Sequence, residues 1–275
     1  MYNRKVAQTV WFSLILLFCI LMVFPFIWMT MISFKRPLEL ILEPNRIIPR
    51  TMYLKNYILI LGAKYRYYIL FINSIKISVI NVVGNLVTSS LAGYAFARLK
   101  FKGRDFFFLL ILATLMIPPQ VTIIPRFILF HWMGLVDTHY SLILPGLFSV
   151  IGTFMMRQFF LQIPFELSES AYIDGASEYR TFFQVIFPLA KPAIISIIVI
   201  NFTWHWNDFQ NPLIFLRSQK LFTIPLGLNF FAEENDTQLE LVATASVLSS
   251  LPMIVVFIIA QRHFITGLTS GGIKG

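Results

Sequence analysis

Five residues between positions 201 and 211 have the side chains in this sequence best suited to hold a polar solute. Their spacing places them on one face of a continuous helix. They are Asn201, Trp204, His205, Asp208 and Asn211. Amides, an imidazole and a carboxylate form hydrogen bonds with hydroxyl groups, and an indole stacks on the apolar C–H face of a sugar. An ionisable group inside a membrane indicates function, so we predict a sugar-binding face here. Two alternatives remain: these side chains bind neighbouring helices, or Asp208 lies at the outer water interface.

The elements that must position this face are apolar segments long enough to cross a membrane. The chain is 57% hydrophobic and 13% charged, whereas soluble domains have about 25% charged residues. Six apolar segments are predicted to span the bilayer, which takes about 20 helical residues. They cover residues 10–34, 71–97, 106–117, 140–160, 192–216 and 242–262. No repeat or low-complexity stretch separates them, so we expect an all-α membrane protein with one domain over residues 1–275.

Two of these segments contain residues that affect helix packing. Ser89, Gly93 and Ala97 recur every four residues in the second segment, and small residues at this spacing let another helix approach closely. Simple tolerance of small residues in lipid is the alternative. The third segment is short and ends at Pro118 and Pro119, where a regular helix cannot continue. Irregular backbone at membrane depth must be covered by protein or water, so we expect this bend near a translocation path or its outer mouth.

A polar stretch, residues 162–191, separates the fourth and fifth apolar segments and has the pattern of a helix, a turn and a second helix. Pro164 is placed where a first helical turn tolerates it. Gly175 suits the left-handed conformation that ends a helix, and Ser177 suits the cap of the next one. A polar hairpin between membrane spans has little role in the bilayer. We therefore predict that a partner in the aqueous phase binds it.

This stretch resembles the coupling loop of ABC-importer permeases, which reads E-A-A, three residues, Gly, nine residues, I-x-L-P. The matching positions are Glu169, Ser170, Ala171, Gly175, Val185, Phe187 and Pro188. Ser170, Val185 and Phe187 depart from the pattern but roughly keep its size or apolar character. The resemblance implies that the loop sits in a groove of a cytoplasmic ATPase. The residues that it assigns to this coupling are Glu169, Ala171, Asp174 and Gly175.

Other stretches resemble the permeases of maltose-type carbohydrate importers. They are GYAFARLKFKGRD after the second segment, WHWNDFQNPLIFL in the fifth, and the C-terminal QRHFITGLTSGGIKG. The resemblance covers nearly all of residues 10–275. It implies the type I importer permease fold, with six transmembrane helices, a core over about residues 71–262 and a cytoplasmic helix-turn-helix coupling loop. The implied function is to carry a sugar or oligosaccharide across a bacterial or archaeal plasma membrane.

The resemblance also implies partners: a second, homologous permease forming a heterodimer, two ABC ATPase subunits or domains, and an extracellular or periplasmic solute-binding protein. Membrane lipid is expected around the chain, and nucleic acid is not, because no basic face is present. Two alternatives concern the substrate and the energy source. One is a glycerol-phosphate-type or other polyol substrate. The other is a secondary transporter working without ATP, although the inverted repeats typical of such carriers are not visible.

The basic residues alone do not orient the chain. In the six-span arrangement, eleven Lys and Arg fall on the side of the termini and ten on the other side, so the positive-inside rule is undecided. The compact basic turn from Arg98 to Arg104 favours the cytoplasm, whereas seven basic residues between Lys35 and Arg66 argue the other way. The coupling-loop match decides, because an ATPase is met only in the cytoplasm. We therefore expect both termini there.

The sequence contains no motif for enzyme chemistry or for a cofactor. It has no G-x-x-x-x-G-K-[ST] loop to hold ATP phosphates and no H-E-x-x-H metal motif. Cys19 is the only cysteine and lies within the first apolar segment. The histidines are scattered, and we expect structural or surface roles for His131 and His139. The chain is predicted to be a transport subunit whose ATP hydrolysis occurs on a partner.

Overall fold

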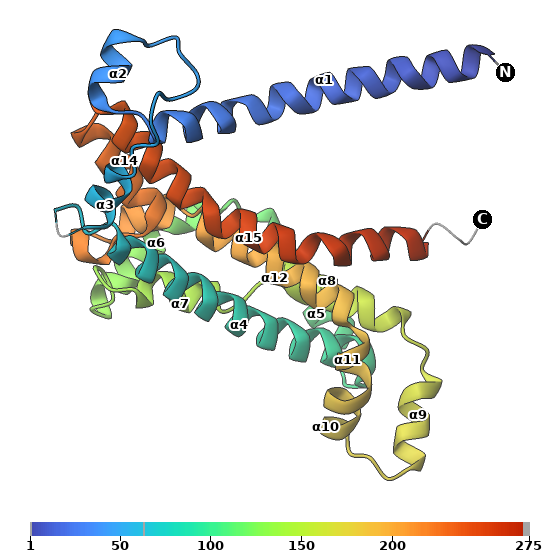
Figure 1. Cartoon of the computed structure of the whole chain (residues 1–275). Coiled ribbons are helices and arrows are strands. Elements are labelled where there is room, and N and C mark those ends of the chain that lie inside the picture. Colours follow the sequence, from blue (N-terminus) through green and yellow to red (C-terminus); the bar gives the residue numbers. More distant parts are fainter. Residues whose placement is uncertain (1, 63, 272–275) are drawn as a thin grey trace. The chain divides into compact units, whose positions relative to one another are not determined.

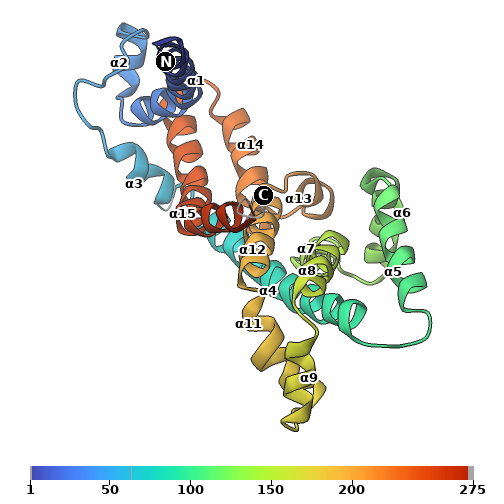
Figure 2. The ribbon, with the colours of Figure 1, turned by 90° about the vertical axis from the view of Figure 1, so that its right-hand side faces the viewer.

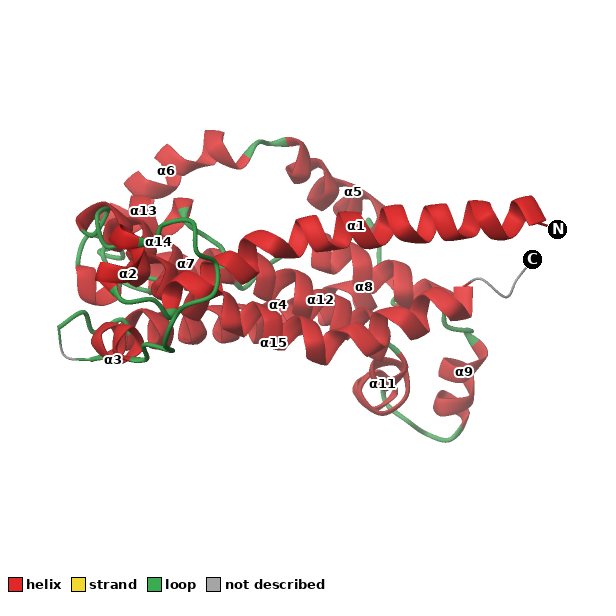
Figure 3. Cartoon of the chain, turned by 45° about the horizontal axis from the view of Figure 1, so that its top comes forward, coloured by secondary structure: helices red, strands yellow, loops and turns green. Residues whose placement is uncertain are grey.

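The computed structural model describes residues 2–62 and 64–271, and over these residues it consists of helices and loops without β-strands (Figure 3). The α-helices are α1 (Tyr2–Ser33), α2 (Pro37–Leu42), α3 (Lys55–Leu61), α4 (Tyr68–Arg98), α5 (Arg104–Ala113), α6 (Pro119–Trp132), α7 (Tyr140–Gly146), α8 (Val150–Gln162), α9 (Glu166–Ile173), α10 (Glu178–Thr181), α11 (Phe187–Leu189), α12 (Lys191–Trp206), α13 (Gln210–Phe215), α14 (Ile224–Glu234) and α15 (Leu239–Gly271). Two 3₁₀ helices, η1 (Thr114–Met116) and η3 (Gln219–Leu221), and a π-helix, η2 (Phe182–Ile186), complete the helical elements. The all-α prediction is confirmed.

The chain separates into two compact units. One contains residues 1–68 and 227–251, and the other contains residues 69–226 and 252–275. Both candidate sites predicted from the sequence belong to the second unit. The organisation of residues 1–275 as one domain stays a prediction.

The first unit is held together at the end of α1. The buried Asn56 side chain donates hydrogen bonds to the carbonyls of Ser33 and Lys35, each at 2.9 Å. Thr244 Oγ1 lies 3.2 Å from the same Ser33 carbonyl. Carbonyls at a helix end lack partners within the helix, so these polar side chains fix the end of α1. Residues 8–28 of α1 are exposed, so this part of the helix is free to face lipid or another subunit.

Four helical stretches are long and apolar enough to cross a membrane, and two bent helix pairs raise the number to six if each pair is one span. The four are Gln8–Ser33, Tyr68–Arg98, Tyr140–Gln162 and Leu239–Gln261. They correspond to the first, second, fourth and sixth predicted segments. The predicted bend in the third segment is confirmed, because Arg104–Met116 and Pro119–Trp132 meet at 97°. The fifth segment was predicted wrongly as one helix over residues 192–216, since α12 ends at Trp206.

In the second unit, α8 packs against α12 and against α4, and the three helices are seen together in Figure 1. The small residues of α4 bring α8 close: a Cβ added to Gly93 would lie 2.6 Å from Met156 Cβ and 2.9 Å from Arg157 N. This confirms the predicted close approach. A hydrogen bond also holds α4 near the break between α7 and α8, where Thr88 Oγ1 donates to the Leu147 carbonyl at 2.7 Å. Helix α4 therefore stabilises the irregular backbone of its neighbour.

Candidate functional site

The predicted hairpin consists of α9, a tight turn and a second helical arm, and it projects from one end of the second unit (Figure 2). Gly175 has φ +78°, and its N–H donates to the Tyr172 carbonyl at 3.0 Å. The Ala176 N–H donates to the Ala171 carbonyl at 2.9 Å. These two bonds form the Schellman motif that a glycine after a helix favours. The Ser177 side chain accepts a hydrogen bond from the Arg180 N–H at 3.4 Å, so both predicted turn residues are confirmed.

Two details of the hairpin differ from the expectation. Pro164 precedes the helix and does not lie in its first turn, because α9 begins at Glu166 after the cap residue Phe165. The second arm is also less regular than predicted. It passes from α10 through the π-helix η2 to α11, and π-helices are rare and frequently found at functional sites.

The tip of the hairpin exposes large apolar side chains together with acidic ones. Ile173 is 86% exposed and Tyr179 is 77% exposed, while Glu169 and Asp174 are also exposed. Ala171 differs from the other residues assigned to coupling, because it is buried. Sequence reasoning missed Ile173 and Tyr179, although apolar residues flanking a polar turn were the available signal. An exposed apolar tip rimmed by charge is typical of an interaction surface.

The base of the hairpin is anchored to α4. Tyr94 Oη donates to Glu178 Oε2 at 2.9 Å, and the Tyr94 and Phe182 rings lie 4.9 Å apart. Arg98, which the sequence groups with the basic turn, is buried. Its Nη2 donates to the carbonyls of Phe160, at 2.7 Å, and Ile163. Hairpin and span are thus joined by charge-assisted hydrogen bonds, which are stronger than neutral ones.

The five residues predicted to bind sugar do not share one helical face. Helix α12 ends at Trp206, and α13 begins only at Gln210. The Asn207 side chain donates to the Thr203 carbonyl at 2.9 Å, and Asp208 Oδ1 accepts from the Asn211 N–H at 3.1 Å. Asn and Asp side chains compete for backbone bonds in this way and favour helix ends. The Asn-Asp pair was therefore the missed signal for a break.

The structure brings some of the predicted residues together. Asp208 Oδ2 accepts from Asn211 Nδ2 at 2.8 Å, and Asn211 Oδ1 accepts from Arg126 Nη2. The Arg126 guanidinium also lies 5.0 Å from the centre of the Phe215 ring. Sequence reasoning missed Arg126 because it follows the proline-rich bend and was counted only as an outer charge. Asp208, Asn211 and Arg126 form a polar cluster between α6 and α13.

The other three predicted residues have separate environments. Asn201 is buried, and its Nδ2 donates to the Ile197 carbonyl at 2.9 Å within α12. His205 Nδ1 lies 3.2 Å from Asn81 Nδ2 on α4. Trp204 is 49% exposed. Of the three, Trp204 alone presents a large open surface to a solute.

The connection between α6 and α7 has a charged contact of its own. Asp137 Oδ1 accepts from the N–H groups of Arg217 and Ser218, each at 2.9 Å, and Oδ2 accepts from Ser218 Oγ at 2.5 Å. These hydrogen bonds, led by the Ser218 side chain, lower the pKa of Asp137 to about 2. His139 Nε2 lies 3.0 Å from the Leu221 carbonyl, and burial lowers the pKa of its imidazole. His139 therefore has the structural role predicted for it.

Together, the apolar helical spans and the projecting hairpin define a multi-pass membrane protein of the transport class. The chain belongs to the family of binding-protein-dependent transport system inner membrane components, whose match covers residues 84–270. It is a permease subunit of an ABC importer.

Two relatives and one solved structure show the extent of the likeness. The chain is 39% identical over 255 residues to the arabinooligosaccharides transport system permease protein AraQ of Halalkalibacterium halodurans, covering 92% of this chain and 91% of that protein. It is 34% identical over 278 residues to the galactooligosaccharides transport system permease protein GanQ of Bacillus subtilis, covering 99% and 98%. A bacterial ABC transporter involved in the import of the acidic polysaccharide alginate contains a chain of the same fold. Its TM-score is 0.86 at 22% identity, covering 96% of this chain and 98% of that one.

Proposed function

We propose that this chain is one of two permease subunits in an importer for a sugar or oligosaccharide, powered by ATP hydrolysis on a partner. The names of the relatives, which transport arabinooligosaccharides and galactooligosaccharides, support the substrate class. The complex includes a second homologous permease, two ABC ATPase subunits or domains and a solute-binding protein outside the membrane. The chain crosses the membrane six times, with the bent pair of α5 and α6 forming the third span, α12 forming the fifth, and both termini in the cytoplasm.

The hairpin of α9 and α10 transmits movement between the ATPase and the membrane spans. The observation that carries this role is its exposed tip, where Ile173 and Tyr179 stand out from a tight Schellman turn. Burying such side chains in a groove contributes about 25 cal/mol per Å² of apolar area. Glu169 and Asp174 lie on the same hairpin, and their negative charge orients it in the ATPase groove. Ala171 is buried, and its packing inside the hairpin maintains the conformation of the tip.

The sugar path runs past the end of α12. Trp204 offers its exposed indole for stacking, and the Asp208, Asn211 and Arg126 cluster offers hydrogen-bonding groups at the break between α12 and α13. His205 borders this region through Asn81. Asn201 is buried, so it orients α12 and does not contact the sugar. Breaks in membrane helices expose polar backbone groups only where protein or water covers them, which suits a path for a hydroxylated solute.

Charge reversal on the hairpin tests the coupling role. Glu169→Lys and Asp174→Lys should each lower the amount of ATPase that co-purifies with the permease by at least fivefold, with normal membrane insertion. Sugar uptake should fall in parallel. The matched control is Glu234→Lys, which reverses an exposed acidic residue at the end of α14, outside the hairpin. Full ATPase recovery and full uptake in both hairpin variants would contradict the proposed role.

A further inference from the structure

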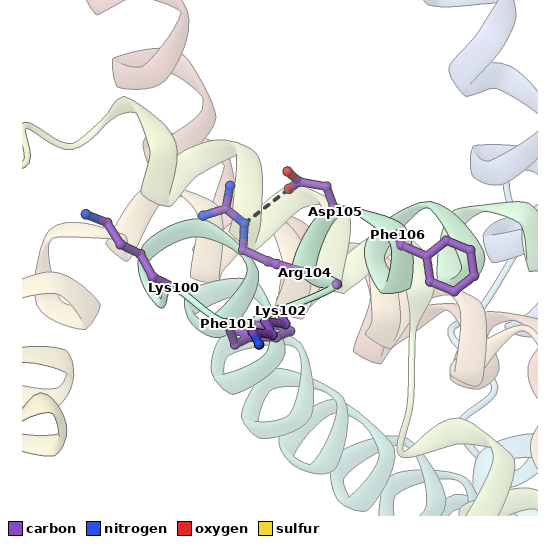
Figure 4. A pocket seen from close by; sticks show the side chains of 7 residues that line it. Lys100, Phe101, Lys102, Arg104, Asp105 and Phe106 are labelled. Carbon is purple, nitrogen blue, oxygen red and sulfur yellow. Dashed lines mark hydrogen bonds and ion pairs between the residues drawn. The ribbon is translucent and has the colours of Figure 1, made fainter.

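We infer that the turn between α4 and α5 binds the headgroup of an anionic phospholipid. Residues 100–106 surround a hollow of about 630 Å³ at the surface of the second unit (Figure 4). Lys100, Phe101, Lys102 and Phe106 are all exposed there. The lysines offer ammonium groups for the charged phosphate of an anionic lipid, and the phenylalanines offer apolar surface for its body.

The charge of this turn is only partly neutralised by the protein. Asp105 Oδ1 lies 3.1 Å from Arg104 Nε and 3.8 Å from Arg157 Nη2, so these two arginines share one carboxylate. Arg98 is buried and donates to main-chain carbonyls. Among the residues that the structure describes, Lys100 and Lys102 have neither an ion-pair nor a hydrogen-bond partner. Their positive charge is therefore available to an external anion.

The apolar surface next to the lysines is suited to acyl chains. Phe106, Phe107, Leu109 and Leu110 on α5 each expose more than half of their surface. Basic side chains at the end of such a helix lie at headgroup level, with the apolar face in hydrocarbon. Phe101 lies between the two lysines in the sequence and adds exposed apolar surface beside them. The turn thus presents charge and apolar surface in the order in which a bilayer presents phosphate and acyl chains.

The position of the turn agrees with an anionic leaflet. Arg98 at the end of α4 bonds to the end of α8, and Tyr94 bonds to Glu178 of the hairpin. The turn therefore lies at the same end of the second unit as the hairpin. This step rests on the proposed function, which places the hairpin in the cytoplasm, where the leaflet carries a negative surface potential.

Lipid titration of the purified importer tests the inference. The complex is stripped of lipid in detergent and titrated with dioleoyl phosphatidylglycerol or with dioleoyl phosphatidylcholine, and bound lipids are counted by native mass spectrometry. We expect the unaltered complex to prefer the anionic lipid. A basic residue near an anionic surface contributes about fivefold in affinity, so the pair Lys100→Gln and Lys102→Gln should reduce this preference by at least fivefold. The pair Lys100→Arg and Lys102→Arg should retain most of it.

The matched control removes two basic residues at the opposite end of α4. Asn73 near the start of α4 donates to the Lys220 carbonyl at 2.9 Å, and a 31-residue helix is about 46 Å long. The pair Arg217→Gln and Lys220→Gln should leave the preference unchanged. An unaltered complex without preference, or a preference that survives Lys100→Gln and Lys102→Gln, would overturn the inference. So would a loss of co-purifying ATPase in that pair with the lipid preference intact, because it would assign the lysines to a protein contact.

The outcome is independent of the test of the coupling hairpin. Lipid counting requires neither uptake nor ATP hydrolysis. If the hairpin variants keep full ATPase binding while the lipid preference behaves as expected, the proposed coupling role fails and the lipid site stands.

Discussion

Arg98 shows how one buried cation can organise the end of a membrane span. Its Nη2 bonds to carbonyls in and just beyond the last turn of α8, and its guanidinium lies 4.7 Å from the centre of the Phe165 ring. A cation at a helix C-terminus contributes up to about 2 kcal/mol in partly buried geometry. Nε and Nη1 have no hydrogen-bond partner among the described residues. The arginine is therefore committed to structure, unlike the lysines that follow it.

Asp137 provides a pH-dependent contribution to stability. It adopts φ +59°, a conformation that Asn and Asp tolerate better than other non-glycine residues, and its pKa is lowered to about 2 from an ordinary 3.8. A carboxylate with a lowered pKa stabilises the fold above its ordinary pKa, and this stabilisation is lost as pH falls through the lowered value. We expect Asp137→Asn to keep the backbone but flatten the fall in thermal stability between about pH 4 and pH 2.

Thermal unfolding of the purified protein in detergent, followed at several pH values, measures this effect. Asp236→Asn is the control, because Asp236 is an exposed acid in the other compact unit. Its pH profile should match that of the unaltered protein. An Asp137→Asn profile that also matches it would show that the hydrogen bonds of Asp137 contribute no net stability.

At the level of the element, α12 presents two tryptophans in opposite environments. Trp206 is 2% exposed and stacks on Phe202 with ring centres 5.4 Å apart, whereas Trp204 is 49% exposed. Truncating a buried tryptophan costs about 3–5 kcal/mol, while exposed positions usually change stability by about 0.5 kcal/mol or less. We expect Trp206→Ala to lower the yield of assembled complex. Trp204→Ala should preserve the yield but lower sugar uptake per complex by roughly tenfold.

The comparison of yield with uptake per assembled complex separates a packing role from a sugar contact. Trp204→Phe should keep part of the activity, because a smaller ring still stacks. If Trp204→Ala reduces yield as strongly as Trp206→Ala, then Trp204 packs against another helix and does not meet the sugar. Normal uptake per complex in Trp204→Ala would exclude its ring from the path.

The elements that the sequence predicts well are those specified by local rules. Long apolar runs identify α1, α4 and α15, and Gly175 with Ser177 identifies the hairpin turn, because φ and capping depend on a few neighbouring atoms. The end of α12 was missed although Asn207 and Asp208 interrupt the apolar composition there, because the polar residues were assigned to a sugar-binding face. The contact of Arg126 with Asn211 could not be predicted from the sequence either. It joins residues 85 positions apart, and no local pattern specifies such a pair.

At the level of the molecule, one helix joins the two candidate sites within a single compact unit. Helix α12 begins at Lys191, where the hairpin ends, and stops at Trp206, just before the break with Asp208. Its 16 residues span about 24 Å. Rigid secondary elements can carry coupling between distant sites when both sites bias the same element. Movement of the hairpin is therefore expected to reach the sugar path through this helix.

We expect the hydrogen bond from Tyr94 to Glu178 to affect how much sugar is transported per ATP hydrolysed. Removing the hydroxyl by Tyr94→Phe leaves the buried ring and its contact with Phe182 in place but removes the hydrogen bond between α4 and the second arm. We expect sugar transported per ATP hydrolysed to fall several-fold, with ATPase binding unchanged. Tyr140→Phe is the control, since Tyr140 is an exposed tyrosine at the start of α7, outside the hairpin. An unchanged transport ratio in Tyr94→Phe would show that the hairpin does not act through this bond.

The π-helix in the second arm has a consequence for how this chain can change over evolutionary time. Residues Phe182–Ile186 form a π-helix, in which each backbone hydrogen bond joins residues five apart instead of four. The arm therefore contains one residue more than a plain α-helix would need. Deleting one residue there would let the arm revert to an α-helix, and the turns on either side would keep nearly their present orientation, because the π-helix absorbs the extra residue locally. The second arm can therefore lose one residue at this place and still present the same tip. The same deletion within the regular helix α9 would rotate one side of that helix by about 100° and would turn the tip away from its partner.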